Sequence, residues 1–210
     1  MPALCERKTD ISIIVPVYNL EEFLTPMINS LTWQDFGGYT VQIIFVLNNC
    51  TDRSEDVIRD SELDCTVIEC TTQGCGPARN AGFEIATGEY VWFLDGDDWL
   101  LSSTAVKEVL DKAYAEDLDI LYIPFSSKTY RSQYFSMMPQ YLLRREWVKE
   151  FRFPDYQPAE DDAYMMQVLA KAGKNQVDYW TLPSVGKPLY YYNFGRPGSN
   201  MMRYYAGEQI

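Results

Sequence analysis

Hydrophobic positions along the chain alternate between a strand pattern and a helix pattern over the first 125 residues. Apolar runs of strand length occupy residues 11–17, 41–47, 65–70, 90–94 and 118–125. Helices are expected between these runs, mostly with apolar residues three or four apart, over residues 23–31, 54–60, 80–86 and 106–113. This order predicts an α/β fold with a mostly parallel central sheet, joined by right-handed crossovers and flanked by helices.

Turn and cap residues set the expected boundaries of these elements. Pro26 either lies in the first turn of its helix, with Thr25 as the cap, or bends that helix. Ser102 or Ser103 is expected to cap the helix after the fourth strand. The third strand alternates apolar and polar residues, which is typical of a strand near the edge of a sheet.

Beyond residue 125 the pattern weakens, and the last clear element is a helix expected over residues 160–172. Aromatic and methionine residues are frequent before it, and we expect most of them to pack on the sheet. The tail over residues 188–210 is rich in Tyr, Gly and Asn. No linker, internal repeat or low-complexity tract divides the chain, so residues 1–210 are expected to form one domain.

The most informative segment is the end of the fourth apolar run, where three acidic residues surround one glycine. Asp95, Asp97 and Asp98 follow a strand whose β-branched and aromatic residues suit the interior of a sheet. Their carboxylates are therefore expected at the rim of the sheet, where open α/β folds bind ligands. Such hard oxygen ligands beside Gly96 suit Mg²⁺ or Mn²⁺ shared with a substrate phosphate. The alternative is a turn, since Asp-Gly is common in turns and acids favour a helix start.

Composition excludes several classes of protein. The 210 residues carry a formal net charge of −12, which argues against an extended surface for nucleic acid. No apolar stretch is long enough to span a membrane, and the N-terminus has no signal-peptide pattern. The five cysteines are odd in number and lack the C-x-x-C spacing of zinc sites, so reduced thiols in a cytoplasm are expected.

The chain contains no histidine, and this narrows the chemistry that it can perform. Ser-His-Asp and Cys-His nucleophile systems are excluded, together with zinc held by histidine. A general base must therefore be Asp or Glu, or less readily Tyr, Lys or Cys.

Six segments, taken in order, resemble glycosyltransferase family 2, whose members have the GT-A fold and use nucleotide-sugar donors. They read VPVYN, VLNNCTD, GPARNAG, GEYVWFLDGDD, EDD and YYYNFGRPGS, at residues 15–19, 46–52, 76–82, 88–98, 160–162 and 190–199. Each segment is weak by itself, but their order and spacing cover nearly the whole chain. The resemblance implies a Rossmann-like GT-A domain. Its nucleotide-sugar-binding half is expected at about residues 10–125, and its acceptor-binding and catalytic-base half at 126–210.

The resemblance implies roles in binding the nucleotide-sugar. Pro16 and Tyr18 follow the first strand, where the family cradles the base and an aromatic ring offers a stacking face. Asn48 stands where the family usually has an Asp that recognises the base; its amide can still pair with a pyrimidine, and uridine is the default. Arg79 is expected on a glycine-containing loop that enters a helix, contacting a phosphate. Arg196 in the tail is expected to close over the diphosphate as part of a lid.

The same resemblance implies the metal site and the base. Asp95 and Asp97 match the Asp-x-Asp motif: Asp95 contacts the ribose or the metal, and Asp97 binds the Mn²⁺ or Mg²⁺ that bridges the diphosphate. Glu160-Asp161 is similar to the Glu-Asp motif whose Asp is the catalytic base, here Asp161. Glu160 or Asp162 is expected to orient the acceptor or support the helix. Without the resemblance, helix capping alone explains these acids.

Together these roles predict an inverting, metal-dependent sugar transfer from a nucleotide diphosphate, with a UDP-sugar favoured, to a hydroxyl of a glycan or another acceptor. Asp161 would deprotonate that hydroxyl as it attacks the anomeric carbon. The Gln-x-x-Arg-Trp signature and membrane helices of the family's processive synthases are missing, so a soluble single-transfer enzyme is expected. The alternatives are a degenerate GT-A-like module that binds a nucleotide or a partner, and a nucleotidyltransferase.

Overall fold

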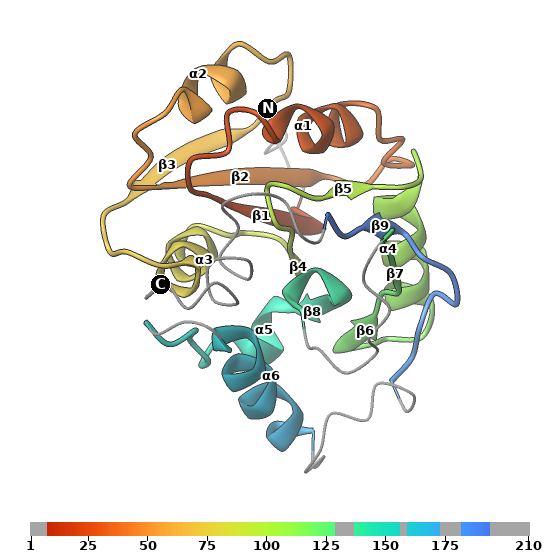
Figure 1. Ribbon diagram of the computed structural model, residues 1–210. Coiled ribbons are helices and arrows are strands. Elements are labelled where there is room, and N and C mark those ends of the chain that lie inside the picture. Colours follow the sequence, from red (N-terminus) through yellow and green to blue (C-terminus); the bar gives the residue numbers. More distant parts are fainter. Residues whose placement is uncertain (1–7, 129–136, 156–158, 173–181, 194–210) are drawn as a thin grey trace, which may run out of the picture.

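A six-stranded sheet forms the centre of the protein in the computed structural model, which describes residues 8–128, 137–155, 159–172 and 182–193 (Figure 1). Its strand order is β3-β2-β1-β4-β8-β6. The strands span Ile11–Val17 (β1), Val41–Asn48 (β2), Thr66–Cys70 (β3), Tyr90–Phe93 (β4), Ile120–Tyr122 (β6) and Tyr141–Arg144 (β8). β1 to β4 pair in parallel, whereas β8 runs antiparallel to both of its neighbours. The predicted α/β fold with a mostly parallel sheet is confirmed, and β3 lies at the expected edge.

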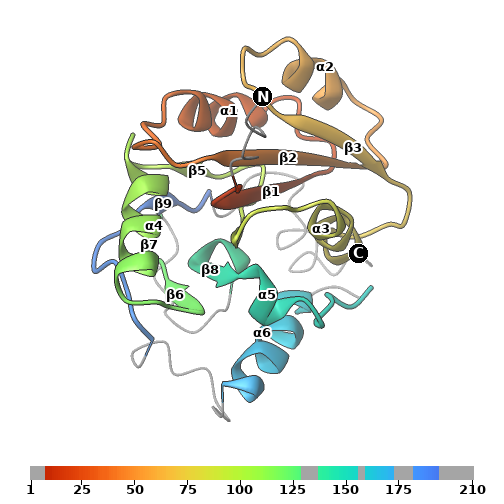
Figure 2. The ribbon, with the colours of Figure 1, turned by 180° about the vertical axis from the view of Figure 1, so that it is seen from behind.

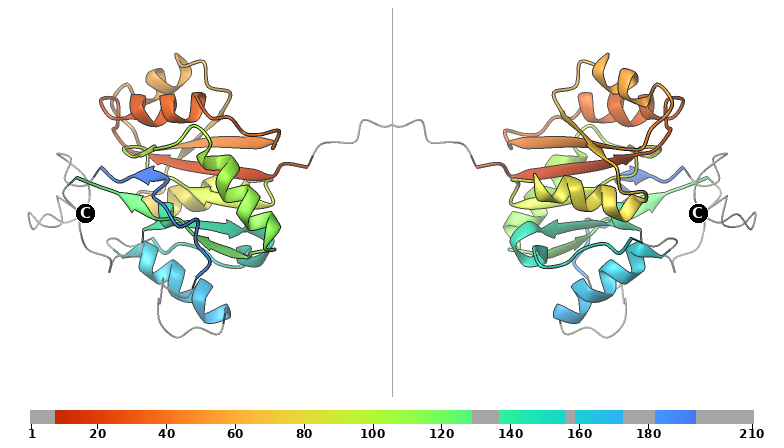
Figure 3. Two further views of the ribbon diagram at one scale, coloured as in Figure 1. Left: turned by 90° about the vertical axis from the view of Figure 1, so that its right-hand side faces the viewer. Right: turned by 90° about the vertical axis from the view of Figure 1, so that its left-hand side faces the viewer.

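Helices cover both faces of this sheet (Figures 1 and 2). They span Leu24–Thr32 (α1), Ser54–Arg59 (α2), Cys75–Glu84 (α3), Ala105–Ala115 (α4), Arg145–Val148 (α5) and Glu160–Lys171 (α6). Ile11, Ile13 and Val15 of β1 pack in one apolar cluster with α1 and α4. Ile14 packs in a second cluster with α3 and α6, because alternate side chains of a strand point to opposite faces. In the side views, α6 lies beside β8, far from α1 (Figure 3).

A second, three-stranded sheet joins the chain after the acidic segment to a strand near the C-terminal tail. Its strands are β5 (Trp99–Leu100), β7 (Phe125–Ser126) and β9 (Tyr190–Tyr191), in the order β5-β9-β7. The rings of Trp99 and Tyr191 stack with centroids 4.2 Å apart. The small sheet therefore fixes the end of the segment that begins at Asp95.

Several predicted boundaries are wrong. α1 begins at Leu24 after Phe23, so Thr25 is not its cap, and Pro26 lies in the first turn, where its missing N–H costs no helical hydrogen bond. α4 begins after Thr104 rather than after a serine; the backbone N–H of Thr104 donates to the Ser102 hydroxyl.

The end of the predicted fifth strand is also wrong. Residues 118–125 hold the short strands β6 and β7, which belong to different sheets. Pro124 lies between them and has no N–H to continue a ladder. β8, which the sequence pattern did not indicate, takes the place beside β4.

Two further predictions from composition concern membrane-spanning segments and cysteine thiols. Among them, no helix has both the length and the apolar character needed to cross a membrane. Cys50, Cys65, Cys70 and Cys75 are free thiols.

The close approach of α3 to the sheet depends on Gly82, and this gives a prediction. A Cβ atom added at Gly82 would lie 2.5 Å from Cγ2 of Ile14 and 3.1 Å from Cγ2 of Val46, which is closer than packed atoms approach. Gly82→Ala should therefore lower the free energy of unfolding by about 1–3 kcal/mol through overpacking. Urea denaturation monitored by circular dichroism measures this change; a variant as stable as the wild type would contradict it.

Candidate active site

The carboxyl ends of the four parallel strands meet at one edge of the sheet, and the loops that follow them are tied together there. Asn19, just beyond β1, accepts a hydrogen bond from the backbone N–H of Thr51 at 2.8 Å. The backbone N–H of Glu21 donates to Asp52 at 2.9 Å, and that of Arg53 donates to Glu21 at 2.7 Å. These contacts join the loops after β1 and β2 into one edge, as expected for a ligand site of an open α/β sheet.

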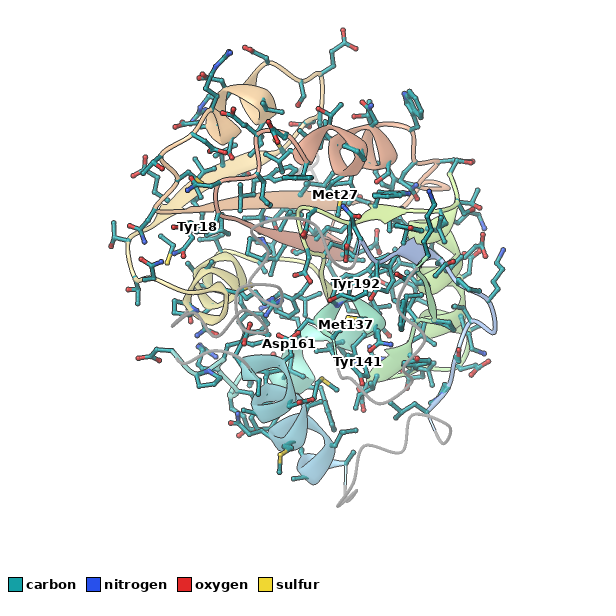
Figure 4. All side chains as sticks on the ribbon, viewed as in Figure 1. Tyr18, Met27, Met137, Tyr141, Asp161 and Tyr192 are labelled. Atoms are coloured by element: carbon teal, nitrogen blue, oxygen red, sulfur yellow. The ribbon has the colours of Figure 1, made fainter. Side chains whose placement is uncertain are left out.

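Pro16 and Tyr18, predicted to cradle the base of a nucleotide, occupy this edge in different ways. Pro16 is a buried residue of β1, paired with Val46 of β2. Tyr18 follows the strand and is 41% exposed, which is high for a large aromatic side chain. Its ring therefore offers an accessible apolar face at the carboxyl edge (Figure 4).

Asn48, predicted to recognise the base, is 4% exposed and is engaged with the backbone that leads to α3. Its amide nitrogen donates to the carbonyls of Cys70 at 3.0 Å and Thr72 at 2.6 Å. Its amide oxygen accepts from the backbone N–H of Gly74 at 2.9 Å. Both N–H donors of the amide are thus used, so in this arrangement Asn48 shapes the entry to α3.

The acidic segment turns sharply at the end of β4. The backbone N–H of Asp98 donates to the carbonyl of Asp95 at 3.1 Å. Gly96 packs so closely that an added Cβ would lie 2.8 Å from Cδ1 of Leu20 and 3.3 Å from the carbonyl of Pro16. Asp98 is 1% exposed and accepts the backbone N–H of Asn193 at 2.8 Å.

The first two acids of the segment lie nearer to solvent. Asp95 and Asp97 are only partly buried, and the side chain of Asp95 is 26% exposed. They stay accessible at the sheet rim while Asp98 faces inward.

Arg79 does not lie on a loop. α3 begins at Cys75, directly after Gly74, so Arg79 falls inside the helix, and the predicted glycine loop is its first turn. The side chain is 3% exposed, and its guanidinium faces three carboxylates. Nη2 donates to Oδ1 of Asp95 at 2.9 Å, and Nη1 lies 3.4 Å from Oε1 of Glu160 and also binds Oδ1 of Asp161.

Asp161, the predicted base, lies in the first turn of α6 and is held from two sides. One carboxylate oxygen, Oδ1, binds Arg79. The other, Oδ2, accepts the backbone N–H of Met138 at 3.1 Å. Ala159, just before the helix, has a positive φ of 80°, an unusual conformation for a residue with a Cβ. Asp161 is labelled in Figure 4.

The turn that carries Met138 is itself fixed to the core. The indole Nε1 of Trp92, in β4, donates to the carbonyl of Pro139 at 2.8 Å. The side chain of Gln140 accepts the backbone N–H of Met137 and donates to the hydroxyl of Tyr122. The donor to Asp161 is therefore placed by β4, the same strand that leads to Asp95.

The charges of this cluster do not balance, since one guanidinium serves three carboxyl groups. Burial raises the pKa of Asp161 to about 7; Arg79 opposes this rise, while Glu160 and Asp95 add to it. Burial alone would lower the pKa of Arg79, but the carboxylates, Asp161 foremost, hold it well above its ordinary value. The guanidinium stays charged, and the raised pKa makes Asp161 a stronger proton acceptor than an ordinary aspartate.

Asp95 and Asp97 have the chemistry to hold a divalent cation. Both present carboxylate oxygens, the ligands that Mg²⁺ and Mn²⁺ prefer, and both are partly exposed at the rim of the sheet. In the part of the chain that the structure describes, no group of three or more Cys, Asp or Glu residues is arranged around a metal position. Asp95 and Asp97 would therefore supply only part of the ligand set of a cation bound there.

Sequence reasoning did not anticipate the contacts that join the cluster. Met138 and Phe153 carry no motif, yet one donates to Asp161 and the other lies under Arg79, with Cζ 5.3 Å from the ring centroid. Glu160, expected to orient the acceptor or support the helix, binds Arg79. Arg196 and the predicted lid lie outside the described residues.

Comparisons with known proteins agree with this architecture. A family model described as glycosyl transferase family 2 matches residues 12–175. Poly(ribitol-phosphate) β-N-acetylglucosaminyltransferase TarS of Staphylococcus aureus is 25% identical over 224 residues, covering 94% of this chain and 38% of TarS. The poly(ribitol-phosphate) β-glucosyltransferase of Bacillus spizizenii is 29% identical over 227 residues, covering 91% of this chain and 33% of that enzyme. The chain thus spans about a third of the length of these curated relatives.

Solved structures share the fold. The crystal structure of S. aureus TarS 1–349 in complex with UDP-GlcNAc superposes with a TM-score of 0.79 at 24% identity, over 92% of this chain and 60% of that one. Mannosyltransferase PcManGT from Pyrobaculum calidifontis, in complex with GDP-Man and Mn²⁺, gives a TM-score of 0.67 at 16% identity, over 92% and 59%. Since the fold is that of TarS and the family model spans most of the sequence, the chain belongs to glycosyltransferase family 2.

Proposed function

We propose that this chain transfers a sugar, with inversion, from a nucleotide-diphosphate donor, a UDP-sugar, to an acceptor hydroxyl. The observation that carries the proposal is the placement of Asp161. This carboxyl group is 17% exposed, is held by two donors and is linked through one guanidinium to Asp95 at the rim of the sheet. With Asp161 as the base on one side and Asp95 as a cation-binding acid on the other, a donor bound between them could undergo displacement at its anomeric carbon.

Asp161 acts as the general base in this proposal. A carboxylate oxygen accepts more than one hydrogen bond, so Oδ1 and Oδ2 can each receive an acceptor hydroxyl while Arg79 and Met138 keep their contacts. A pKa of about 7 makes Asp161 a stronger base than an ordinary aspartate, while about half of the groups are ionised at pH 7. The hydroxyl loses its proton to Asp161 as its oxygen attacks the anomeric carbon.

Asp95 and Asp97 hold the donor side. Bound to their carboxylates, a Mn²⁺ or Mg²⁺ ion would neutralise charge on the departing diphosphate. Tyr18, 41% exposed, offers its ring to the base of the nucleotide, and the buried Pro16 shapes the strand end beneath it. Manganese in the structure of PcManGT, which shares the fold, supports this choice of cation.

UDP-GlcNAc and UDP-glucose are the donors to examine first. TarS is structurally similar to this chain in a complex with UDP-GlcNAc, and two curated relatives are named as N-acetylglucosaminyl- and glucosyltransferases of poly(ribitol-phosphate). Those names also support a hydroxyl of a polyol-phosphate polymer as the first acceptor to test.

The donor site predicts metal-dependent stabilisation by UDP. A ligand that binds only the folded state raises the free energy of unfolding by about 2.7 kcal/mol at a hundredfold excess over its Kd. UDP or UDP-GlcNAc with MnCl₂ should therefore raise the melting temperature of the wild type, and Asp97→Ala should lose that rise. Differential scanning fluorimetry measures the shift.

Asp64→Ala serves as the control, because Asp64 is exposed and precedes β3 at the other end of the sheet. It should keep the full rise. A wild type whose melting temperature rises with no nucleotide would contradict the donor-site assignment and favour a degenerate module. A rise with UTP accompanied by pyrophosphate release would favour a nucleotidyltransferase.

The base assignment predicts a loss of turnover without a loss of donor binding. Asp161→Asn removes the proton acceptor and keeps the size of the side chain, so kcat should fall by roughly 10²- to 10⁴-fold. The KM for the donor should stay within about threefold, since the base acts on the other substrate. Asp60→Asn makes the same charge change at an exposed residue after α2 and should leave kcat unaltered. Equal loss of donor affinity in Asp161→Asn would count against the assignment.

The raised pKa of Asp161 predicts how stability depends on pH. A carboxyl group whose pKa is higher in the folded state stabilises the protein at low pH, and this contribution is lost as pH rises through the folded value, about 7. Asp161→Asn resembles the neutral form, so its free energy of unfolding should gain on that of the wild type between the ordinary pKa of 3.8 and about pH 7. Urea denaturation of both proteins in EDTA tests this; a difference that stays constant with pH would contradict it.

A further inference from the structure

Two arginines in this protein have the same kind of environment at opposite ends of β4. Arg79 faces Asp95, Glu160 and Asp161. Arg144 also binds three carboxylates, those of Glu89, Asp117 and Asp119, at 2.6–2.9 Å. Each guanidinium also lies over an aromatic ring, that of Phe153 for Arg79 and that of Tyr90 for Arg144.

The carboxylate clusters around Arg79 and Arg144 connect different parts of the fold. Arg144 pairs with Tyr90, the first residue of β4, at the end of the sheet remote from the acidic segment. Its contacts hold the β6–β8 corner together, where the side chain of Asp117 is 93% exposed. Arg79 lies at the other end of β4 and joins two elements that carry proposed functional groups, the segment at Asp95 and the start of α6.

We propose that Arg79 is a positioning residue. It orients the carboxylate of Asp161 toward the acceptor and keeps the base in register with Asp95 on the donor side. This inference rests on the proposed glycosyl transfer, and it gives Arg79 a role other than that of a phosphate ligand.

The planar fork of the guanidinium is what makes this possible. Nη2 is directed to Asp95 and Nη1 to Asp161, so one rigid group fixes the distance and direction between the two carboxylates. The guanidinium cannot turn away easily, because the side chain is 3% exposed and rests on the Phe153 ring. With Met138 holding Oδ2, Asp161 is oriented by donors from two separate elements.

A counter-ion that only neutralised buried charge would not need this geometry. Lysine carries the same charge as arginine but ends in one ammonium group, which cannot keep both ends of the bridge in place. Arg79→Lys therefore keeps the positive charge among the carboxylates but removes the planar group that orients Asp161. Arg144→Lys is the matched control, because it makes the same change in a similar set of carboxylates that lies away from the proposed site.

The experiment compares the steady-state kinetics of the wild type, Arg79→Lys and Arg144→Lys with UDP-GlcNAc or UDP-glucose, MnCl₂ and a polyol-phosphate acceptor. UDP binding is measured separately by calorimetry, and folding by thermal unfolding. Arg79→Lys should lower kcat by about 100-fold, as expected for a misplaced reacting group, while UDP affinity stays within about threefold. Arg144→Lys should melt at a lower temperature and keep the wild-type kcat.

The outcomes are distinguishable. Unchanged kcat in Arg79→Lys, or a matching fall in UDP affinity, overturns the inference and leaves the proposed function standing. An equal fall of kcat in Arg144→Lys also overturns it, because the loss would then follow from weakened folding. A wild type that neither binds UDP nor transfers sugar overturns the proposed function and this inference together.

If Arg79→Lys does not fold, Phe153→Leu tests whether Arg79 has a positioning role. It removes the ring that holds the guanidinium plane and leaves every charge in place. A several-fold fall in kcat with unaltered UDP affinity supports the positioning role, and unchanged kcat overturns it.

Discussion

Parallel pairing of four strands, with β1 and β4 buried along their whole length, is the constraint on which the rest of this structure depends. Every residue of β1 and β4 is buried, and β1 lies between β2 and β4, so the carboxyl ends of these strands must open on the same edge. The loops at Asn19, Asn48 and Asp95 are neighbours for this reason, although tens of residues separate them in the chain. Apolar burial thus decides where the polar groups meet.

Charge burial is the second constraint, and it is concentrated in one place. Taking a guanidinium and three carboxylates out of water is costly unless each is paired, and Arg79 is the one cation that the structure shows among Asp95, Glu160 and Asp161. Burial raises the pKa of Asp161, and the surplus of negative charge from Glu160 and Asp95 adds to that rise and favours a cation nearby. An arrangement that costs stability in the free protein is typical of a site prepared for a charged ligand.

Membership of glycosyltransferase family 2 and the geometry of the site contribute different information. The family model identifies the family, and the likeness to the TarS structure shows that the fold is shared. The contacts of Arg79 come from the structure itself, which shows its guanidinium bridging the carboxylates of Asp95 and Asp161.

The sequence by itself determined the alternation of strands and helices, the parallel sheet, the edge position of β3 and the acidic residues at the end of β4. These follow from local periodicity and from the length of apolar runs, which a single segment carries. It misplaced the start of α3, because Gly74, Gly76 and Pro77 read as a loop. The structure instead begins α3 at Cys75, and Gly76 there lies against the carbonyl of Pro154, a contact between distant segments that no local pattern shows.

Only the tertiary structure decided which charged groups meet. Arg79 and Asp161 are 82 positions apart, and their contact depends on how α3 and α6 pack against one face of the sheet. The donor from Met138 depends on a turn anchored by Trp92, and β8 takes its place through long-range pairing with β4. No local pattern encodes such contacts, since they arise from the packing of elements whose own sequences specify little more than which face is apolar.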